Sequence, residues 1–224
     1  MQTLTNSDLL ARVPLFSQLN AIGLESLARN VVKRRYKRGE SIVVQGSKSI
    51  ALYVLIAGRA SVVAVDGQGK EVILASLQPG DYLGEMSLID GAPHSANVMA
   101  DRQTDVLVLA RAELIACMKV ETAVGFNLMK GLVQRLRQAN QKIESLALMD
   151  VYGRVARVLL DMAQQESDSS LVIKEKISKQ TIAKMVGASR EMVTRVMRDL
   201  EQKRSIVLRA DGSTQVQHKI LSQL

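Results

Sequence analysis

The spacing of apolar residues changes twice along the chain. In residues 4–30 apolar positions recur every three or four residues, which predicts short helices. From Ser41 to Ala110 they form short β-branched runs that are separated by glycine-containing turns such as DGQGK and QPGDYLG. Many short strands with turns of this kind are typical of an antiparallel sandwich or barrel, such as a jelly roll. The pattern therefore predicts a β domain that follows the first helices.

A long helical period begins at Glu121 and continues to about Leu148. Within it, apolar positions follow the alternating steps of four and three that define a heptad seam, at Met129, Val133, Leu136, Asn140, Ile143 and Ala147. A sustained seam is typical of a dimer coiled coil, so we expect a homodimer formed through residues 126–147. Asn140 is polar at a seam position. It either fixes the register of two parallel helices or contacts a ligand at the dimer interface.

The remaining third of the chain predicts a second kind of domain. Asp150 can cap a helix over VYGRVARVLLDMAQQ, and the soft run ESDSS follows. Ser178 and Ser189 can each cap a short helix, and Gly187 lies between the two helices. This arrangement is the helix-turn-helix pattern. The segment SIVLRADGSTQVQH, with its Asp-Gly turn, predicts a hairpin beside it.

The distribution of charged residues indicates what this second domain binds. The chain carries a net charge of +8, and residues 174–209 hold ten basic and four acidic side chains. Arg190, Glu191, Thr194 and Arg195 form a polar face on the second short helix. Arg can read guanine and Glu can accept from cytosine, whereas an acid would weaken indiscriminate phosphate binding. A solvated helix with a Glu191–Arg195 ion pair is the alternative. Aromatic residues make up 3% of the chain and Trp is absent, which favours duplex DNA over single strands.

Several classes of protein are not expected. Cys117 is the single cysteine, which excludes an internal disulfide or a four-cysteine cluster, and we interpret it as a small residue on an apolar face. No apolar run approaches ~18 residues and the N-terminus is polar, so we expect a cytoplasmic protein without a membrane partner. The sequence offers no nucleophile–base pair, metal cluster or nucleoside-triphosphate loop. We therefore expect no enzyme activity.

The order of these parts resembles the cyclic AMP receptor protein / fumarate and nitrate reduction regulator (CRP/FNR) family of bacterial transcription regulators. GASREMVTRVMRDLE resembles the family's recognition helix, and GDYLGEMSLIDGAPHSA resembles its phosphate-binding cassette. The resemblance covers essentially the whole chain and implies an α+β fold in three parts. These are an N-terminal antiparallel jelly-roll sensor domain over 1–120, a long dimerisation helix and hinge over 121–149, and a winged helix-turn-helix domain over 150–224.

The resemblance also implies the DNA contacts. Base readout is expected from Arg190, Glu191 and Arg195, and phosphate contacts are expected from Lys179, Gln180, Ser189 and Thr194. With these readers we expect a palindrome close to TGTGA-N6-TCACA, on which a dimer places its recognition helices ~34–36 Å apart. RNA polymerase is an expected partner. The loop over 65–71 holds fewer acids than some relatives, so activation and repression both stay open.

The effector site is implied in the same way and departs from the family pattern. Its expected residues are Gly84, Glu85, Met86, His94, Ser95, Arg135 and Asn140. Glu85 would bind a ribose 2′-hydroxyl, but His94 stands where the family has an Arg for the cyclic phosphate. Ala139-Asn140 likewise replaces a Thr-Ser pair that touches adenine. His is mostly neutral at pH 7, which predicts weaker binding of cyclic AMP.

Three possibilities for the effector follow: cyclic AMP or a similar mononucleotide, cyclic di-GMP or another effector, and no small-molecule effector. Iron–sulfur, haem and metal cofactors are not expected, because the family's N-terminal cysteine cluster is missing and His94 is the only candidate haem ligand in the sandwich. A further alternative is a cyclic-nucleotide-binding module that acts on a protein partner, although such a module has no use for the basic SREMVTRV segment.

Overall fold

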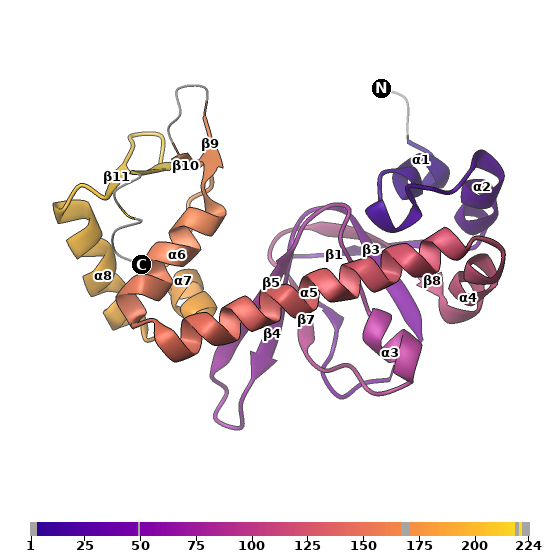
Figure 1. The fold of residues 1–224 in the computed structure, drawn as a ribbon, viewed down its shortest axis with the longest axis horizontal. Helices are drawn as coiled ribbons and strands as arrows, with labels where there is room; N and C mark the ends of the chain where they lie inside the picture. Colours follow the sequence, from indigo (N-terminus) through magenta and orange to yellow (C-terminus); the bar gives the residue numbers. More distant parts are fainter. Residues whose placement is uncertain (1–3, 49, 167–170, 218–219, 221–224) are drawn as a thin grey trace. The chain divides into compact units, whose positions relative to one another are not determined.

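The computed structural model describes residues 4–48, 50–166, 171–217 and 220. The chain divides into two compact units, residues 1–136 and 137–224, and helix α5 (Thr122–Leu148) contributes to both. Figure 1 shows the elements of each unit along the chain. His218 of the predicted hairpin and most of the ESDSS run lie outside the described residues.

The first unit contains two four-stranded antiparallel sheets. Leu55 and Val106 from one sheet pack in a buried cluster with Leu77 and Val98 from the other. This confirms the predicted β-sandwich within an α+β fold. One sheet has the order β1 (Val32–Tyr36), β8 (Thr104–Ala110), β3 (Ala51–Ala57), β6 (Tyr82–Leu83); the other has the order β2 (Ser41–Val43), β7 (Asn97–Ala100), β4 (Ala60–Val65), β5 (Glu71–Leu77).

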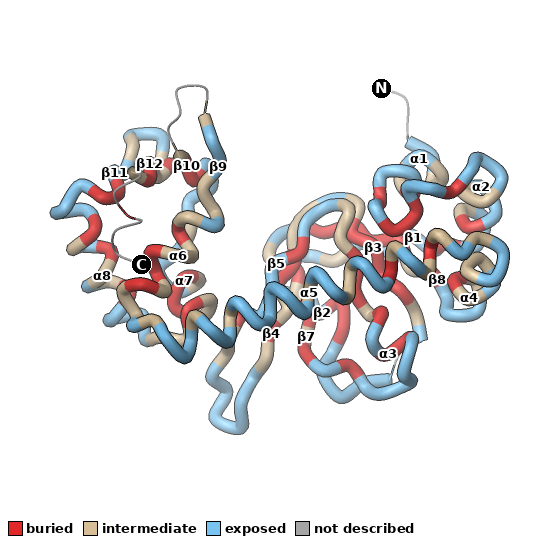
Figure 2. The backbone as a smooth tube through the Cα atoms, viewed as in Figure 1, coloured by how far each residue is buried: buried red, intermediate tan, exposed pale blue. Residues whose placement is uncertain are grey.

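Helices close the end of this sandwich. Val124 and Leu128, on the first turns of α5, are buried in one cluster with Leu10, Phe16 and Leu107. The start of α5 is thereby anchored to the unit, whereas most of its later residues are exposed (Figure 2). The other helices of this cluster are α1 (Asn6–Ala11), the 3₁₀ turn η1 (Pro14–Phe16), α2 (Ala21–Arg29), α3 (Glu85–Asp90) and α4 (Arg111–Val120).

Strand β1 was not predicted from the sequence. It reads VKRRY and nearly all of it is exposed, so it lacks the alternation that marks a half-buried strand. It pairs with β8, and Arg35 Nε lies 2.6 Å from Asp105 Oδ1 across the pair. Charged side chains on an edge strand also discourage pairing with other chains.

The second unit is a helix-turn-helix with a small sheet. Helices α6 (Val151–Met162), α7 (Lys179–Val186) and α8 (Arg190–Gln202) share a buried core. The sheet has the order β11 (Ile206–Leu208), β12 (Thr214–Val216), β10 (Leu171–Ile173), β9 (Gln164–Gln165). The expectation of a helix through Gln165 was wrong by one turn, because Gln164 and Gln165 pair with β10 instead.

Candidate effector and DNA-binding sites

The cassette contains a glycine, Gly84, at a position where the backbone geometry requires it. Gly84 has φ +87°, in the left-handed region that favours glycine, and it precedes helix α3 (Glu85–Asp90). A side chain at this position would also collide with the carbonyl oxygen of Ala51. The tight turn places Glu85 at the start of α3 with 3% of its surface exposed.

Arg135 of α5 binds this buried carboxylate. One guanidinium nitrogen of Arg135 lies 2.5 Å from Glu85 Oε1, and the other donates to the carbonyl oxygen of Tyr82. The guanidinium also lies over the Tyr82 ring, 4.8 Å from its centroid. A buried carboxylate needs such a partner, because an unpaired charge in the interior is costly. The structure therefore brings together Glu85 and Arg135, two of the residues expected in the effector site.

Tyr82 and Gly131 form a second contact between the cassette and α5. A Cβ atom at Gly131 would overlap the phenol oxygen of Tyr82. That oxygen is buried and has no hydrogen-bond partner among the described residues, and burial raises the pKa of the phenol. Sequence analysis did not identify either residue. The available signal was a glycine in the interior of a long helix, which costs about 1 kcal/mol relative to Ala and often marks a close approach.

Tyr82→Phe should stabilise the protein. The change removes a buried hydroxyl that lacks a partner, and leaving such a group unsatisfied costs about 1–3 kcal/mol. We expect the free energy of unfolding, measured by urea denaturation, to rise by about 1 kcal/mol. Tyr36→Phe, at a half-buried position in β1, is the control. A loss of stability in Tyr82→Phe would show that the hydroxyl has a partner.

His94 does not occupy an open position in the cassette. Only 7% of its surface is exposed, and its Nδ1 lies 3.1 Å from the hydroxyl oxygen of Ser87, which is also buried. Burial lowers the pKa of His94, and the carboxylate of Glu85 opposes this shift only in part. The imidazole is therefore mostly neutral at pH 7. Ser87 was not among the predicted site residues, because nothing in its local sequence shows which way His94 points.

The other predicted effector residues are exposed. Met86 on α3 is 54% exposed, and Ser95 is exposed directly after His94. Asn140 is exposed on the part of α5 that belongs to the second unit. Met86 and Ser95 thus lie within the same short segment as Glu85 and His94, while Asn140 belongs to a different compact unit.

The serine caps predicted for the two helices of the helix-turn-helix are present. Ser178 Oγ accepts from Thr181 N at 3.0 Å at the start of α7, and Ser189 Oγ accepts from Met192 N at 3.2 Å at the start of α8. Gly187 ends α7 with φ +66°, which allows the tight turn between the helices. Val193 and Leu200 bury the inner face of α8.

The predicted base readers share the outer face of α8. Arg190, Glu191 and Arg195 are all exposed. The amide of Glu191 and the side chain of Ser189 hold the pKa of the Glu191 carboxyl below its usual value, so it is ionised at neutral pH. A side chain ionised in this way can accept from a cytosine amino group.

Three of the four predicted phosphate contacts lie at the starts of α7 and α8. Lys179 and Gln180 are exposed on the first turn of α7, and Ser189 is exposed at the start of α8. The hydroxyl of Thr194 donates to the carbonyl oxygen of Arg190 at 2.8 Å, so in this structure its proton is directed into the helix. Lysines and helix starts are groups that commonly contact the DNA backbone.

The two units match two known domain families. Residues 33–121 match the cyclic nucleotide-binding domain, and residues 153–220 match the Crp-like helix-turn-helix domain. The cAMP-activated global transcriptional regulator Vfr of Pseudomonas aeruginosa is 32% identical over 185 residues, which are 80% of this chain and 86% of Vfr. The cAMP-activated global transcriptional regulator CRP of Salmonella typhimurium is 32% identical over 183 residues, which are 80% of this chain and 86% of CRP. The chain belongs to the CRP/FNR family.

Solved structures share the CRP/FNR fold. The catabolite activator protein of Thermus thermophilus is 29% identical with a TM-score of 0.55, and the match covers 94% of this chain and 100% of that one. The c-di-GMP responsive global regulator CLP of Xanthomonas campestris is 24% identical with a TM-score of 0.73, covering 88% of this chain and 98% of CLP. The latter shows a shared fold. The predicted family and fold class are thus confirmed.

Membership of the CRP/FNR family determines the general activity. The chain is a DNA-binding transcription regulator and not an enzyme, as its helix-turn-helix domain and its relatives show. In the described part of the chain, no helix is long and apolar enough to cross a bilayer. The described residues also hold no group of three or more His, Cys, Asp or Glu side chains that could bind a metal ion.

Proposed function

We propose that this CRP/FNR regulator acts as a homodimer that reads a palindrome close to TGTGA-N6-TCACA. The observation that carries the proposal is the outer face of α8, where Arg190, Glu191 and Arg195 are exposed together above a fully apolar inner face. Arg forks onto guanine and Glu accepts from cytosine in the major groove. Lys179, Gln180, Ser189 and Thr194 are the proposed phosphate contacts, of which Thr194 would have to redirect its hydroxyl.

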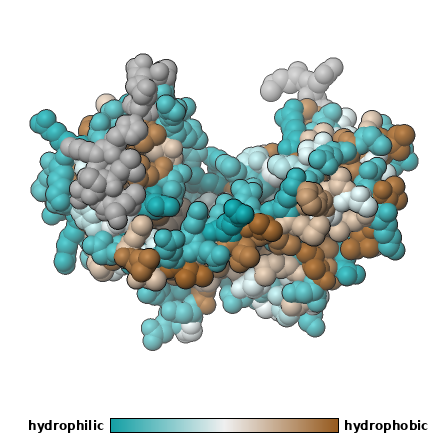
Figure 3. Space-filling view, in the orientation of Figure 1, coloured by the Kyte–Doolittle hydropathy of each residue, from teal (hydrophilic) through white to brown (hydrophobic). Residues whose placement is uncertain are grey.

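The proposed dimer interface is the seam over residues 126–147. Met129, Val133, Leu136 and Ile143 are between 50% and 63% exposed in the single chain, which is unusual for large apolar side chains that share one helix face. Figure 3 shows apolar surface along α5. Pairing of two such helices would bury this stripe. Asn140, at one of the seam positions, is then available to fix the register or to meet a ligand.

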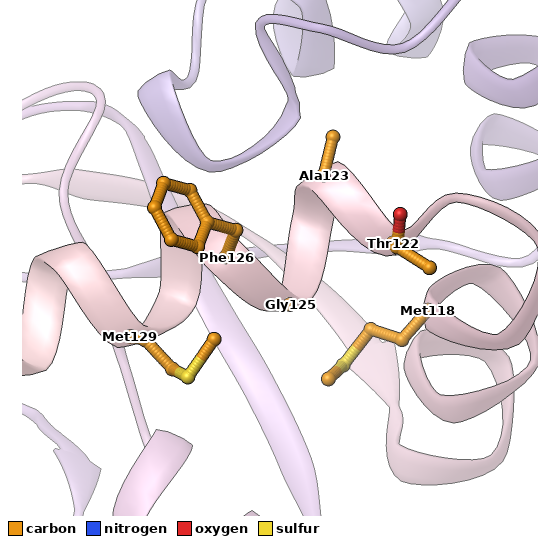
Figure 4. Close-up of a pocket in the computed structure, with 6 residues that line it drawn as sticks. All are labelled: Met118, Thr122, Ala123, Gly125, Phe126 and Met129. Carbon is orange, nitrogen blue, oxygen red and sulfur yellow. The ribbon is translucent and has the colours of Figure 1, made fainter.

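A groove extends the seam toward the start of α5. It has a volume of about 600 Å³ and is lined by Met118, Thr122, Ala123, Gly125, Phe126 and Met129. In Figure 4, Met118 of α4 and Met129 of α5 both point into the space beside Gly125. Phe126 precedes Met129 by three residues and therefore continues the heptad seam. We place this groove inside the same interface between two copies.

The proposed effector is a cyclic nucleotide bound at the cassette. Relatives that are 32% identical are named as cAMP-activated, which supports cyclic AMP. Glu85 and Arg135 supply a hydroxyl-binding pair, and Ser95 supplies an exposed hydroxyl. Cyclic di-GMP stays an alternative, as does action without an effector. A ligand can act only if it binds the DNA-competent arrangement more tightly than the other, and α5 is the proposed lever because it carries both Arg135 and the seam.

The proposed protein partner at the promoter is RNA polymerase, on the ground of family membership. The division into a sensor over 1–120, a helix and hinge over 121–149 and a reader over 150–224 is likewise a proposal. Its functional boundary at Asp150 coincides with the start of α6, where the Asp150 side chain accepts from Gly153 N at 2.8 Å. The proposed hinge is the break between α5 and α6 at that point.

The direct test of the DNA proposal is the affinity for a TGTGA-N6-TCACA duplex, measured by gel shift without ligand, with cyclic AMP and with cyclic di-GMP. Specific binding should exceed that to an unrelated duplex by at least about 10³-fold. The ligand that raises it identifies the effector. Equal affinity for both duplexes under all three conditions would contradict the proposal.

His94→Arg should strengthen binding of cyclic AMP. An Arg–phosphate contact is charge-assisted and bidentate, and hydrogen bonds to charged groups contribute about 1.5–3 kcal/mol. We expect calorimetry to show a dissociation constant about tenfold lower than that of the natural chain. His94→Gln, which adds no charge, should show no such gain. An unchanged affinity in the arginine variant would place the phosphate elsewhere.

A further inference from the structure

Ser87 and His94 form a buried polar pair within the cassette. Their side chains meet at 3.1 Å, and the two residues are 3% and 7% exposed. The main chain of His94 is held at both of its polar groups, because its N–H donates to the carbonyl oxygen of Ser47 and its carbonyl oxygen accepts from Gly46 N. The backbone of His94 is therefore held by Gly46 and Ser47, and its imidazole contacts the Ser87 hydroxyl.

The cassette offers little positive charge to a phosphate. Residues 84–98 contain no Lys or Arg. Arg135 reaches the cassette from α5, but its two terminal nitrogens bind Glu85 and the carbonyl oxygen of Tyr82. Lys48, next to the Ser47 carbonyl that His94 binds, is exposed to solvent. Arg111 also reaches the cassette, where its Nε donates to the carbonyl oxygen of Leu88 at 2.7 Å. His94 is thus the one basic side chain within residues 84–98 that could face a phosphate.

The ionisable groups around His94 favour its neutral form overall. Burial lowers the pKa of the imidazole, and the Glu85 carboxylate raises it by less. Arg135 neutralises that carboxylate through their ion pair. Asp90, at the end of α3, is exposed and accepts from Ala92 N. A neutral imidazole whose Nδ1 meets a hydroxyl cannot replace the guanidinium that the family uses for the cyclic phosphate.

We propose that Ser87 is a positioning residue that sets the effector selectivity of this cassette: by holding His94 inward, it makes the site read the ribose of a nucleotide while gaining little from the phosphate. This inference rests on the proposed effector function. The ligand class it names is ribonucleosides and cyclic ribonucleotides with a free 2′-hydroxyl. Adenosine and cyclic AMP should then bind with similar affinity, because they share the ribose and differ in the phosphate.

The test is calorimetric titration of the full chain with adenosine and with cyclic AMP, at pH 6 and pH 8. For the natural chain, we expect the two dissociation constants to differ by less than about tenfold at both pH values, since a charged phosphate contact would contribute about ten- to a hundredfold. Ser87→Ala frees the imidazole to take up a proton beside the phosphate. In this variant the preference for cyclic AMP should rise at least threefold at pH 6 and return toward the natural value at pH 8. Ser87→Thr, which keeps the hydroxyl, should behave like the natural chain.

The possible outcomes separate the two proposals. If the natural chain prefers cyclic AMP by more than about tenfold, Ser87 does not set the selectivity and the inference is overturned. Equal preferences in the natural chain and in Ser87→Ala, at both pH values, would also overturn the inference. If neither ligand binds the natural chain, the proposed effector site fails and the inference fails with it.

Discussion

Replacing Arg190 and Glu191 together with Ala should abolish the preference for the operator over unrelated DNA. Each good base contact contributes about 1–3 kcal/mol, and a dimer makes these contacts in both half-sites. The affinity for the operator should therefore fall by at least about 10³-fold. Affinity for unrelated duplex should change little, because the double replacement removes one positive and one negative charge and so leaves the net charge of the reader unchanged.

A matched control lies in the same unit. Arg157 and Asp161 form an i,i+4 ion pair on α6, at 3.8 Å, with both side chains partly exposed. Arg157→Ala with Asp161→Ala removes the same two charge types away from α8 and should leave operator preference intact. Fluorescence anisotropy with both duplexes measures the two effects. An equal loss on operator and unrelated DNA in the α8 variant would mean that these residues contact the backbone and not the bases.

Charges placed in the seam of α5 should dissociate the dimer. Leu136 and Ile143 are 61% and 63% exposed in the single chain, and in the proposed dimer each would face an apolar residue of the second copy. Leu136→Glu with Ile143→Glu would bury like charges opposite each other, which is strongly unfavourable. We expect the dissociation constant of the dimer to rise by at least about 10³-fold, because this change removes several kcal/mol of apolar burial and adds repulsion.

Sedimentation equilibrium measures this change directly. Gln138→Glu with Gln141→Glu is the control, because both residues are exposed outside the seam and the pair adds the same two negative charges. The control should remain dimeric and bind the operator, whereas the seam variant should be monomeric and lose operator binding. A seam variant that stays dimeric would place the interface on another surface of the chain.

The parts of the fold that were predicted are those with a local signal. Runs of β-branched residues between glycines predicted most strands of the sandwich. The serine caps, together with Gly187, predicted α7 and α8. The elements that were missed depend on distant partners. Strand β1 is charged and is defined by its pairing with β8, and β9 is two glutamines held by β10. No local pattern distinguishes such segments from loops.

In the effector site, too, some residues could be predicted from the sequence and others depend on distant partners. Glu85 and Arg135 were expected from the family resemblance, and the structure joins them in an ion pair. The burial of His94 and its contact with Ser87 could not be predicted, because Gly46, Ser47 and Ser87 come together with His94 only in the folded chain. A side chain at a family position can thus have partners that the family motif does not show.

The central claim, a dimer that reads two half-sites at a fixed separation, is tested most directly by changing that separation. Affinity is measured for TGTGA-N6-TCACA and for a duplex with the same half-sites and five base pairs added to the spacer, which rotates one site by about half a helical turn. The account predicts that the longer spacer weakens binding by at least about a hundredfold, because only one recognition helix can then reach a major groove in register. Equal affinity for the two duplexes would contradict it.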